Sequence, residues 1–327
     1  MPSDRGRRSV LLGLDDYGAA LVLLCLVAYG ALRVPNFLSE MNLSAILYQY
    51  SIVGLLALGQ LLVVLTAGID LSQGSLLALT SITTALVMVH HGPVLGALAG
   101  LALPTSVGVL SGLLVSRLRM PPFLVTLGTM GIARGMAMQI ANAHPVPIHN
   151  EAFIAFGSGT LFHVPVSTFI WIAACVALHF FLTRRPFGRH VYAVGSSEES
   201  SRLSGVKVSS VKLTVYVISA LLSAVGGVIW TSRLGSGSPV GGQNYELESI
   251  AAVVVGGASL FGGKGRVDGI VAGVLIFGVI NSVLNLSGIS PFWQGMIKGA
   301  VVLLAVALTQ IRSRPDERAA AGGVAHA

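Results

Sequence analysis

Long apolar segments recur along almost the whole chain, and they limit its fold more than any other feature of the sequence. A helix that crosses the hydrocarbon core of a bilayer needs about 20 mostly apolar residues. Ten such segments follow one another in the 327-residue chain. They cover residues 17–33, 44–67, 72–90, 93–116, 122–141, 164–183, 211–232, 248–262, 267–286 and 292–311. The pattern predicts an all-α, polytopic membrane protein with about ten transmembrane helices.

The scarcity of charge supports the same interpretation. Charged residues make up 10% of the chain, against about 25% in a soluble domain. So few charges cannot coat a water-facing surface, and we expect membrane lipid around most of the protein. The net charge of +7 could indicate a nucleic-acid partner. Because the basic residues lie at the ends of the apolar segments, we expect no nucleic acid and attribute the charge to membrane orientation.

The positions of Lys and Arg predict the orientation. With the N-terminus inside and one crossing per segment, all but four of the 20 Lys and Arg residues fall on the cytoplasmic side. Two exceptions, Arg33 and Arg233, lie outside, and Arg134 and Lys298 lie within spans. Since cytoplasmic loops carry the excess of Lys and Arg, both termini are predicted to be cytoplasmic.

The domain organisation follows from this topology. A cytoplasmic N-terminal segment covers residues 1–16, a transmembrane domain covers 17–311, and a cytoplasmic tail, expected to be disordered, covers 312–327. The eighth segment, 248–262, is short and rich in glycine, so we expect a broken or steeply packed helix there.

No catalytic machinery is recognisable. Residues 257–265 read GASLFGGKG, which approaches the phosphate-loop pattern G-x-x-x-x-G-K-[ST]. Ala258 replaces its first glycine and Gly265 replaces the Ser or Thr that would hold Mg²⁺. We therefore expect a tight turn and no ATP site. The five histidines in outside loops have no metal-ligand spacing, and Cys25 and Cys175 lie in apolar segments, so no metal site or enzyme activity is predicted.

The longest internal loop, residues 184–211, contains the signals of a short helix. Ser196 can cap it, Glu199 stands three residues later as in a capping box, and Gly205 suits the left-handed residue that ends a helix. The predicted helix covers residues 197–204. Such a capped helix at the membrane surface fits either a docking element for a soluble partner or an ordinary solvated connector.

Two ionisable residues within the apolar segments need separate explanations. Charged groups within a bilayer normally face the bundle interior or water. Arg134 lies deep in the fifth segment, which indicates a pathway or interhelical role, whereas Lys298 could equally extend outward to the interface. Asp70 is the one acidic residue near a predicted helix break, and this weakens the case for a proton relay.

Several long segments carry a family resemblance. They read GQLLVVLTAGIDLSQGSLLAL (59–79), PPFLVTLGTMGIARG (121–135), GRHVYAVGSSEESSRLSGVKV (188–208), YELESIAAVVVGGASLFGGKG (245–265) and GVINSVLNL (278–286). In this order they resemble the permease subunits of ribose-type ABC importers, over about residues 20–310. Gln73 departs from the pattern, since a small or apolar residue is expected after GIDLS.

The resemblance implies a function and a set of partners. It implies a multi-pass permease of the bacterial inner membrane that works as a dimer, with an identical or related chain. A cytoplasmic ATP-binding subunit would bind the ATP and Mg²⁺, so the chain itself needs no cofactor. A periplasmic binding protein would deliver the solute, a ribose-like pentose, a hexose or a related polyol. Nucleosides or branched amino acids are the alternative cargo, and an ion-coupled secondary transporter is the alternative mechanism.

The resemblance also implies residue roles. The loop that would contact the ATPase matches residues 196–208. Its predicted coupling residues are Glu198, Glu199, Arg202, Leu203 and Gly205. Asp70 lies in the GIDLS motif and can cap the following helix. The predicted translocation-pathway residues are Gln60, Asp70, Thr126, Thr129, Arg134, Asn281 and Asn285. Hydrogen bonding between helices is an equal alternative for the uncharged members of this set.

Overall fold

The computed structural model describes residues 4–301, 303, 304 and 307, and the side chains from residue 18 onward. The predicted tail, 312–327, therefore lies outside the described residues. In chain order the first elements are α1 (Asp4–Arg33), α2 (Glu40–Leu65), α3 (Gln73–His91), α4 (Pro93–Ser116), α5 (Pro122–Ile140), β1 (Val146–Pro147), α6 (Glu151–Ser158), β2 (Thr160–Leu161) and β3 (Val164–Pro165). The remaining elements are α7 (Val166–Arg184), α8 (Pro186–Ser196), α9 (Glu198–Leu203), α10 (Val208–Leu234), β4 (Ser236–Gly237), α11 (Tyr245–Val255) and α12 (Val267–Leu286). Residues 291–301 are also helical.

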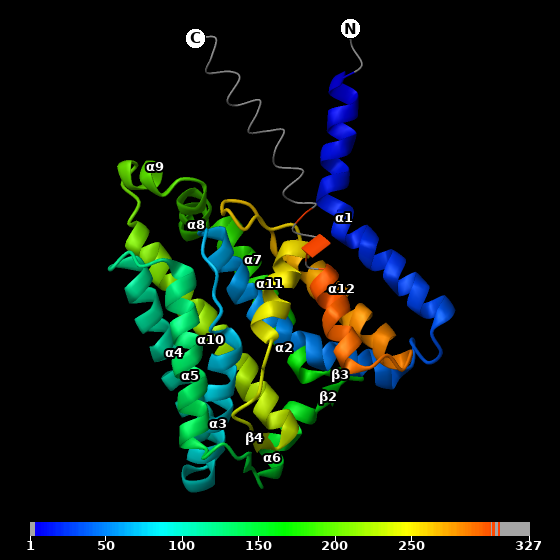
Figure 1. Cartoon of the computed structure of the whole chain (residues 1–327), viewed down its shortest axis with the longest axis vertical. Helices are drawn as coiled ribbons and strands as arrows, with labels where there is room; N and C mark the ends of the chain where they lie inside the picture. The colour runs from blue at the N-terminus through cyan, green and yellow to red at the C-terminus, as the bar shows by residue number, and fades with distance from the viewer. Residues whose placement is uncertain (1–3, 302, 305–306, 308–327) are drawn as a thin grey trace.

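Helix α2 is the centre of the bundle (Figure 1). Every residue from 50 to 65 is buried, and the helix is apolar on all sides. A helix of this kind needs neighbours on every face. It packs against α7, α10, α11 and α12, while α10 also packs against α3 and α4. The all-α prediction is thus confirmed in its main outline; the two-residue strands form only small antiparallel pairs, β1 with β4 and β2 with β3.

Within the described residues, seven helices are long and apolar enough to cross a membrane: α2, α3, α4, α5, α7, α10 and α12. The first predicted segment corresponds to an apolar stretch, residues 18–33, at the end of the longer α1. The tenth is described as a helix over residues 291–301 and at residues 303, 304 and 307. The protein is therefore polytopic, and the count of ten crossings remains a prediction.

The eighth predicted segment, 248–262, is broken, as its glycines led us to expect. Helix α11 has 11 residues and ends at Val255. Gly257 is left-handed, and the amides of Gly257 and Ala258 bond back to the carbonyls of Val254 and Val253. This is the Schellman ending of a helix. The apolar residues continue past the break, which is why hydropathy extended the helix too far.

The turn expected in place of a phosphate loop follows α11. The Ser259 amide donates to the Lys264 carbonyl at 2.9 Å, and the Gly262 amide donates to the Ser259 carbonyl at 3.0 Å. Gly262 and Gly263 have left-handed backbones. The chain reverses here and enters α12 directly.

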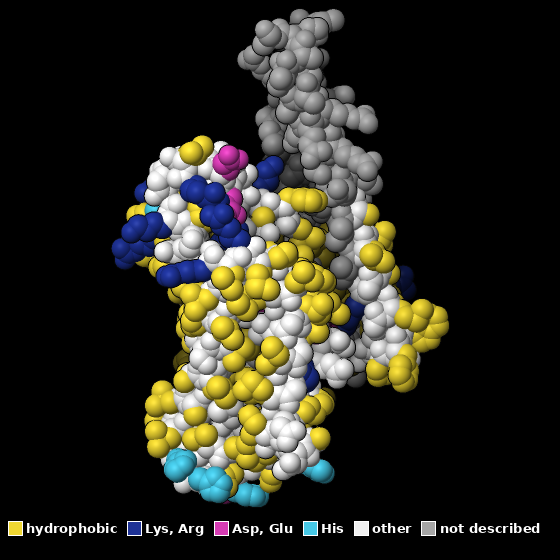
Figure 2. Space-filling model, turned by 60° about the vertical axis from the view of Figure 1, so that its left-hand side comes forward, with side chains coloured by type: hydrophobic (Ala, Val, Ile, Leu, Met, Phe, Trp, Pro, Cys, Tyr) yellow, Lys and Arg dark blue, Asp and Glu magenta, His cyan; other side chains and the backbone are white. Residues whose placement is uncertain are grey.

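The two ends of the bundle differ in chemistry (Figure 2). On the face shown, Lys, Arg, Asp and Glu side chains gather at the end that carries α8 and α9, and His side chains gather at the opposite end. Hydrophobic side chains lie between the two ends, and many large ones are exposed, for example Phe123 and Leu127 on α5 and Val176 on α7. An apolar belt between two polar ends is the surface expected of a membrane protein.

Close backbone contact fixes α11 against α12. A Cβ at Gly269 would lie 2.2 Å from the Gly256 carbonyl oxygen, and one at Gly273 would lie 2.1 Å from the Ala252 carbonyl oxygen. Gly269 and Gly273 form a G-x-x-x-G pair, the spacing that lets membrane helices approach closely.

We expect Gly273→Ala to destabilise the protein, because the added methyl group would force the α11 and α12 backbones apart. Overpacking of this kind costs about 1–3 kcal/mol. The measurement is the thermal unfolding midpoint in detergent. Gly135→Ala is the matched control, since nothing lies within 4 Å of a Cβ built there; equal midpoints for the two variants would contradict the packing argument.

Candidate functional site

Helix α9 has a defined beginning and end. Ser197 is its N-cap, and the Ser197 hydroxyl accepts from the Ser200 amide at 3.2 Å. The predicted Ser196 cap and its capping box with Glu199 are wrong. Ser196 is the last residue of α8, an unpredicted helix, and its hydroxyl donates back to the Tyr192 carbonyl at 3.0 Å. The helical path breaks one residue later, where Ser197 is extended.

The C-terminal end of α9 is as predicted. Gly205 has φ +83°. Its amide donates to the Arg202 carbonyl at 3.0 Å, and the Val206 amide donates to the Ser201 carbonyl at 3.0 Å. These two bonds complete a Schellman motif. Both ends of a six-residue helix are therefore satisfied without neighbouring elements.

The five predicted coupling residues divide into two groups. Glu199, Arg202, Leu203 and Gly205 are exposed, and the Leu203 side chain is 83% exposed. Glu198 instead accepts from Lys212 of α10 at 2.5 Å and from Arg202 at 3.1 Å. The Lys212 hydrogen bond is the main reason why the pKa of Glu198 lies below its usual value. Glu198 thus holds α9 onto α10, while the other four face outward.

Helix α8 connects α9 to the centre of the bundle. A Cβ at Gly195 would lie 1.7 Å from the Leu65 carbonyl oxygen, so α8 touches the end of α2. The Gly263 amide donates to the same Leu65 oxygen at 3.1 Å, and the Tyr192 hydroxyl donates to the Gly265 carbonyl at 2.8 Å. The α8–α9 unit, the end of α2 and the turn before α12 are therefore in direct contact.

A non-helical segment directly follows the end of α2 that α8 contacts. Between α2 and α3, residues 66–72 run as non-helical chain back into the bundle, so that α3 begins about halfway along it (Figure 1). A second interruption, residues 238–244 between β4 and α11, enters the bundle from the opposite end. The two interruptions are in contact with each other. A Cβ built at Gly242 would lie 3.1 Å from the Gly74 carbonyl oxygen.

Asp70 fixes the first interruption. It is 2% exposed. Its Oδ1 accepts from the Ser72 amide at 3.0 Å and from the Ser72 hydroxyl at 2.6 Å, while Oδ2 accepts from Ser219 of α10 at 2.8 Å. The carboxylate therefore orders the turn that leads into α3 and does not reach the first-turn amides of that helix. A buried carboxylate with three donors is well satisfied.

Two glutamines complete this buried network. Gln60 of α2, fully buried, pairs with the Asp70 backbone; its amide, oriented to satisfy both groups, donates to the carbonyl at 3.0 Å and accepts from the N–H at 3.3 Å. Gln73 donates to the Leu56 carbonyl and to Ser219, both at 3.0 Å, and accepts from Ser249 of α11 at 2.8 Å. Gln73 thus joins α2, α3, α10 and α11.

The two threonines of α5 make contacts between elements. The Thr126 hydroxyl donates to the Ile69 carbonyl at 3.0 Å, which ties α5 to the interruption. Thr129 shares a 2.8 Å hydrogen bond with Ser111 of α4. On the other side of the bundle, Asn281 is buried on α12, and exposed Asn285 accepts from Gln294 at 2.8 Å.

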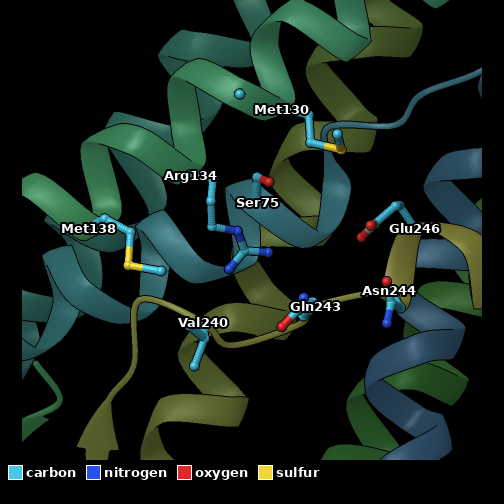
Figure 3. A pocket seen from close by; sticks show the side chains of 9 residues that line it. Ser75, Met130, Arg134, Met138, Val240, Gln243, Asn244 and Glu246 are labelled. Carbon is cyan, nitrogen blue, oxygen red and sulfur yellow. The ribbon is translucent and has the colours of Figure 1, made fainter. Parts of the chain in front are cut away.

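Arg134 lies at a cavity where the two interruptions meet (Figure 3). The cavity measures about 470 Å³ and is lined by Ser75, Met130, Gly131, Arg134, Met138, Val240, Gln243, Asn244 and Glu246. Arg134 Nη1 donates to the carbonyls of Pro239 at 2.8 Å and Gly241 at 3.0 Å. Of the seven predicted pathway residues, only Arg134 lines this cavity. The pathway roles of all seven remain predictions.

Sequence reasoning missed the residues that build this region. Gln73, Ser219, Ser249 and Glu246 were not singled out for it, although Gln73 was noted as a departure. Polar residues within apolar segments were the available signal, but their partners lie far away in the sequence. Lys298 pairs with Glu248 of α11 at 2.6 Å, which settles its open assignment in favour of the interior. No cluster of three potential metal ligands occurs among the described residues.

We expect Gln73→Leu to lower the stability of the bundle strongly. The change would leave the Leu56 carbonyl and the hydroxyls of Ser219 and Ser249 without this partner. Each buried group left unpaired costs about 1–3 kcal/mol. The unfolding midpoint in detergent measures the effect, with Gln139→Leu on the exposed side of α5 as control. An unchanged midpoint for Gln73→Leu would show that the network contributes nothing.

We expect Glu198→Gln to loosen α9 at neutral pH. Because the folded-state pKa of Glu198 is lowered, its ion pairs stabilise α9 above the usual glutamate pKa and are lost as the pH falls through the lowered value. A partly exposed pair contributes up to about 1 kcal/mol, so exchange of the α9 amides should rise up to roughly fivefold. Hydrogen exchange, corrected for intrinsic rates, should show wild type and variant converging in acid; a difference that persists there would contradict the assignment.

Comparison with known proteins identifies the family to which the chain belongs. The family model described as the permease component of branched-chain amino acid transport systems matches residues 42–306. The ribose import permease protein RbsC of Bacillus subtilis is 42% identical, over 92% of this chain and 94% of its own length. From Escherichia coli, the D-allose permease protein AlsC is 35% identical, over 92% of this chain and 93% of its own length. The L-arabinose permease protein AraH of the same organism is 36% identical, over 92% of each chain.

No solved structure gave a significant match. The family match and the three relatives each extend over most of the chain, from the core helix α2 through the 291–301 helix. On these findings the chain is a transport subunit of the membrane and belongs to the family of permease components typified by the branched-chain amino acid transport systems.

Proposed function

We propose that the chain is the permease subunit of an ABC importer that moves a monosaccharide, a ribose-like pentose, a hexose or a related polyol, across the bacterial inner membrane. The relatives named for ribose, allose and arabinose support this cargo, because their similarity covers nearly the whole chain. The observation that carries the proposal is the exposed, doubly capped helix α9 at the charged end of such a bundle. A periplasmic binding protein delivers the sugar.

The energy source lies on another subunit. A cytoplasmic ATP-binding protein binds ATP and Mg²⁺ and contacts α9 through Glu199, Arg202 and Leu203. Each of two permease subunits, identical or related, presents one such helix. ATP binding then drives the bundle between inward-open and outward-open states. The contact of α8 with the end of α2 supports this route, because it joins α9 to the interruption at residues 66–72.

We further propose ten crossings with both termini in the cytoplasm. The concentration of Lys and Arg at the α8–α9 end supports the orientation. α1 and the helix at 291–301 would supply two crossings, and α11 with its extended approach would supply a third. The alternatives are the same fold carrying nucleosides or branched amino acids, and a secondary transporter that needs a coupling ion but no ATPase.

We expect Gly205→Val to uncouple ATP hydrolysis from uptake. A β-branched residue is strained at a φ of +83°, whereas nothing lies within 4 Å of the added Cβ. The effect therefore acts through the backbone of α9. Asn tolerates this conformation, so Gly205→Asn is the matched control and should transport like wild type.

The measurement is uptake of labelled ribose, arabinose and allose into liposomes that contain the permease, its ATPase and its binding protein. Gly205→Val should reduce uptake about tenfold or more if the ends of α9 set the coupling. Normal uptake by Gly205→Val would refute the coupling role of α9. Wild-type uptake that ignores ATP and follows an ion gradient would refute the ABC mechanism.

A further inference from the structure

A buried carboxylate with one oxygen that has no hydrogen-bond partner among the described residues lies at the cavity. The Glu246 side chain is 9% exposed, and its Oε2 has no partner among the described residues. Oε2 lies against Gly74 of α3, where an added Cβ would come within 2.1 Å of it. Burial of a carboxylate oxygen without a hydrogen-bond donor is costly. Such a group therefore requires either water or a ligand that donates hydrogen bonds.

Arg134 lies across the cavity from this carboxylate. Figure 3 shows the two side chains projecting toward the same space from α5 and α11. No ion pair joins them in the described part of the chain, and the hydrogen bonds of Arg134 there use only Nη1. Its Nε and Nη2 donors therefore remain for another acceptor. A ligand between the two side chains would separate and satisfy both.

The rest of the lining fits a small neutral molecule with many hydroxyl groups. The side chains of Ser75, Gln243 and Asn244 can each act as a hydrogen-bond donor and as an acceptor. Met130, Met138 and Val240 offer an apolar wall for the C–H face of a ring. A volume of about 470 Å³ lies within the range of small-molecule sites, about 300–1,000 Å³. An anionic solute would meet the Glu246 carboxylate and be disfavoured.

We propose that this cavity is a transient solute-binding site on the translocation path, with Glu246 as its principal hydrogen-bond acceptor and Arg134 as its principal donor. The ligand class is a neutral polyhydroxy compound, and this assignment rests on the proposed function. Glu246 accepts from ligand hydroxyls, and Arg134 donates to a hydroxyl oxygen on the opposite side. Residues at the first turns of α3 and α11 surround the ligand.

The site would hold the solute at the place where both helical interruptions meet. Ser75 belongs to the first turn of α3 and Glu246 to the first turn of α11. The adjoining Gln73 network ties these two turns together through its bond to Ser249. Movement of either turn would change the shape of the cavity and its hold on the solute.

The test uses liposomes that contain the complete transporter, with binding protein loaded with labelled ribose. We expect Glu246→Ala to reduce the initial uptake rate about tenfold or more, because the acceptor is lost. Stimulated ATP hydrolysis should stay near the wild-type rate, since α9 is untouched. Glu246→Gln keeps one acceptor oxygen and should give an intermediate rate. Glu40→Gln, in the exposed first turn of α2, is the control and should transport normally.

A second pair of variants tests the cavity without changing Glu246. Gly131→Leu should block uptake by filling the cavity, whereas Gly128→Leu, on the same helix but outside the lining, should not. Nothing lies within 4 Å of a Cβ built at either glycine, so both variants should fold. This pair remains informative if Glu246→Ala is not recovered.

Three results would overturn the inference. Wild-type rates for both Glu246→Ala and Gly131→Leu would remove the site while leaving the proposed sugar importer intact. Uptake of leucine in place of sugar, abolished by Glu246→Ala, would replace the polyol with a zwitterion that pairs with both charges. Absence of ATP-driven uptake of ribose, arabinose and allose by the wild type would refute the proposed function and this ligand class with it.

Discussion

The architecture depends on one constraint, which is that backbone polar groups inside an apolar bundle must find partners within the protein. A helix satisfies its own backbone, but an interruption does not. Residues 66–72 are such an interruption, and side chains supply the missing bonds. Thr126 binds the Ile69 carbonyl, Gln60 binds both backbone groups of Asp70, and Asp70 binds the Ser72 amide. The buried polar residues therefore make the interruption possible. The interruption in turn explains why polar side chains lie inside an apolar bundle.

This constraint determines where in the bundle the cavity lies. Because the chain returns into the bundle before α3, the first turn of α3 lies inside the protein, and α11 begins beside it. The N-terminal ends of helices expose amide groups that favour hydrogen-bond acceptors, and glycines let the two approaches come close. Gly74 makes room for Glu246, and Gly242 lies against the Gly74 carbonyl. The same interruption also touches the end of α2, where α8 is anchored, so the α9 end and the cavity belong to one contiguous structure.

The sequence predicted those features that depend on local patterns. Seven spans were found because about 20 apolar residues in a row have few other solutions, and Gly205 was found because a left-handed helix ending favours glycine. The Ser196 cap failed because the preceding residues form α8, which moves the break to Ser197. The glycines of the eighth segment predicted a broken helix, but hydropathy could not locate the break at the left-handed Gly257. The partners of Gln73 and Glu246 could not be predicted, since tertiary packing brings them together from distant segments.

The central claim is that this chain is the membrane half of an ATP-driven importer, coupled through α9. The most direct measurement is to purify the chain from its native membrane in mild detergent and identify the proteins that accompany it, with and without the exposed α9 residues Glu199, Arg202 and Leu203 replaced by Ala. The account predicts an ATPase subunit bound to the wild type and lost from the variant. A chain recovered alone, and still able to move sugar in liposomes without ATP, would contradict it.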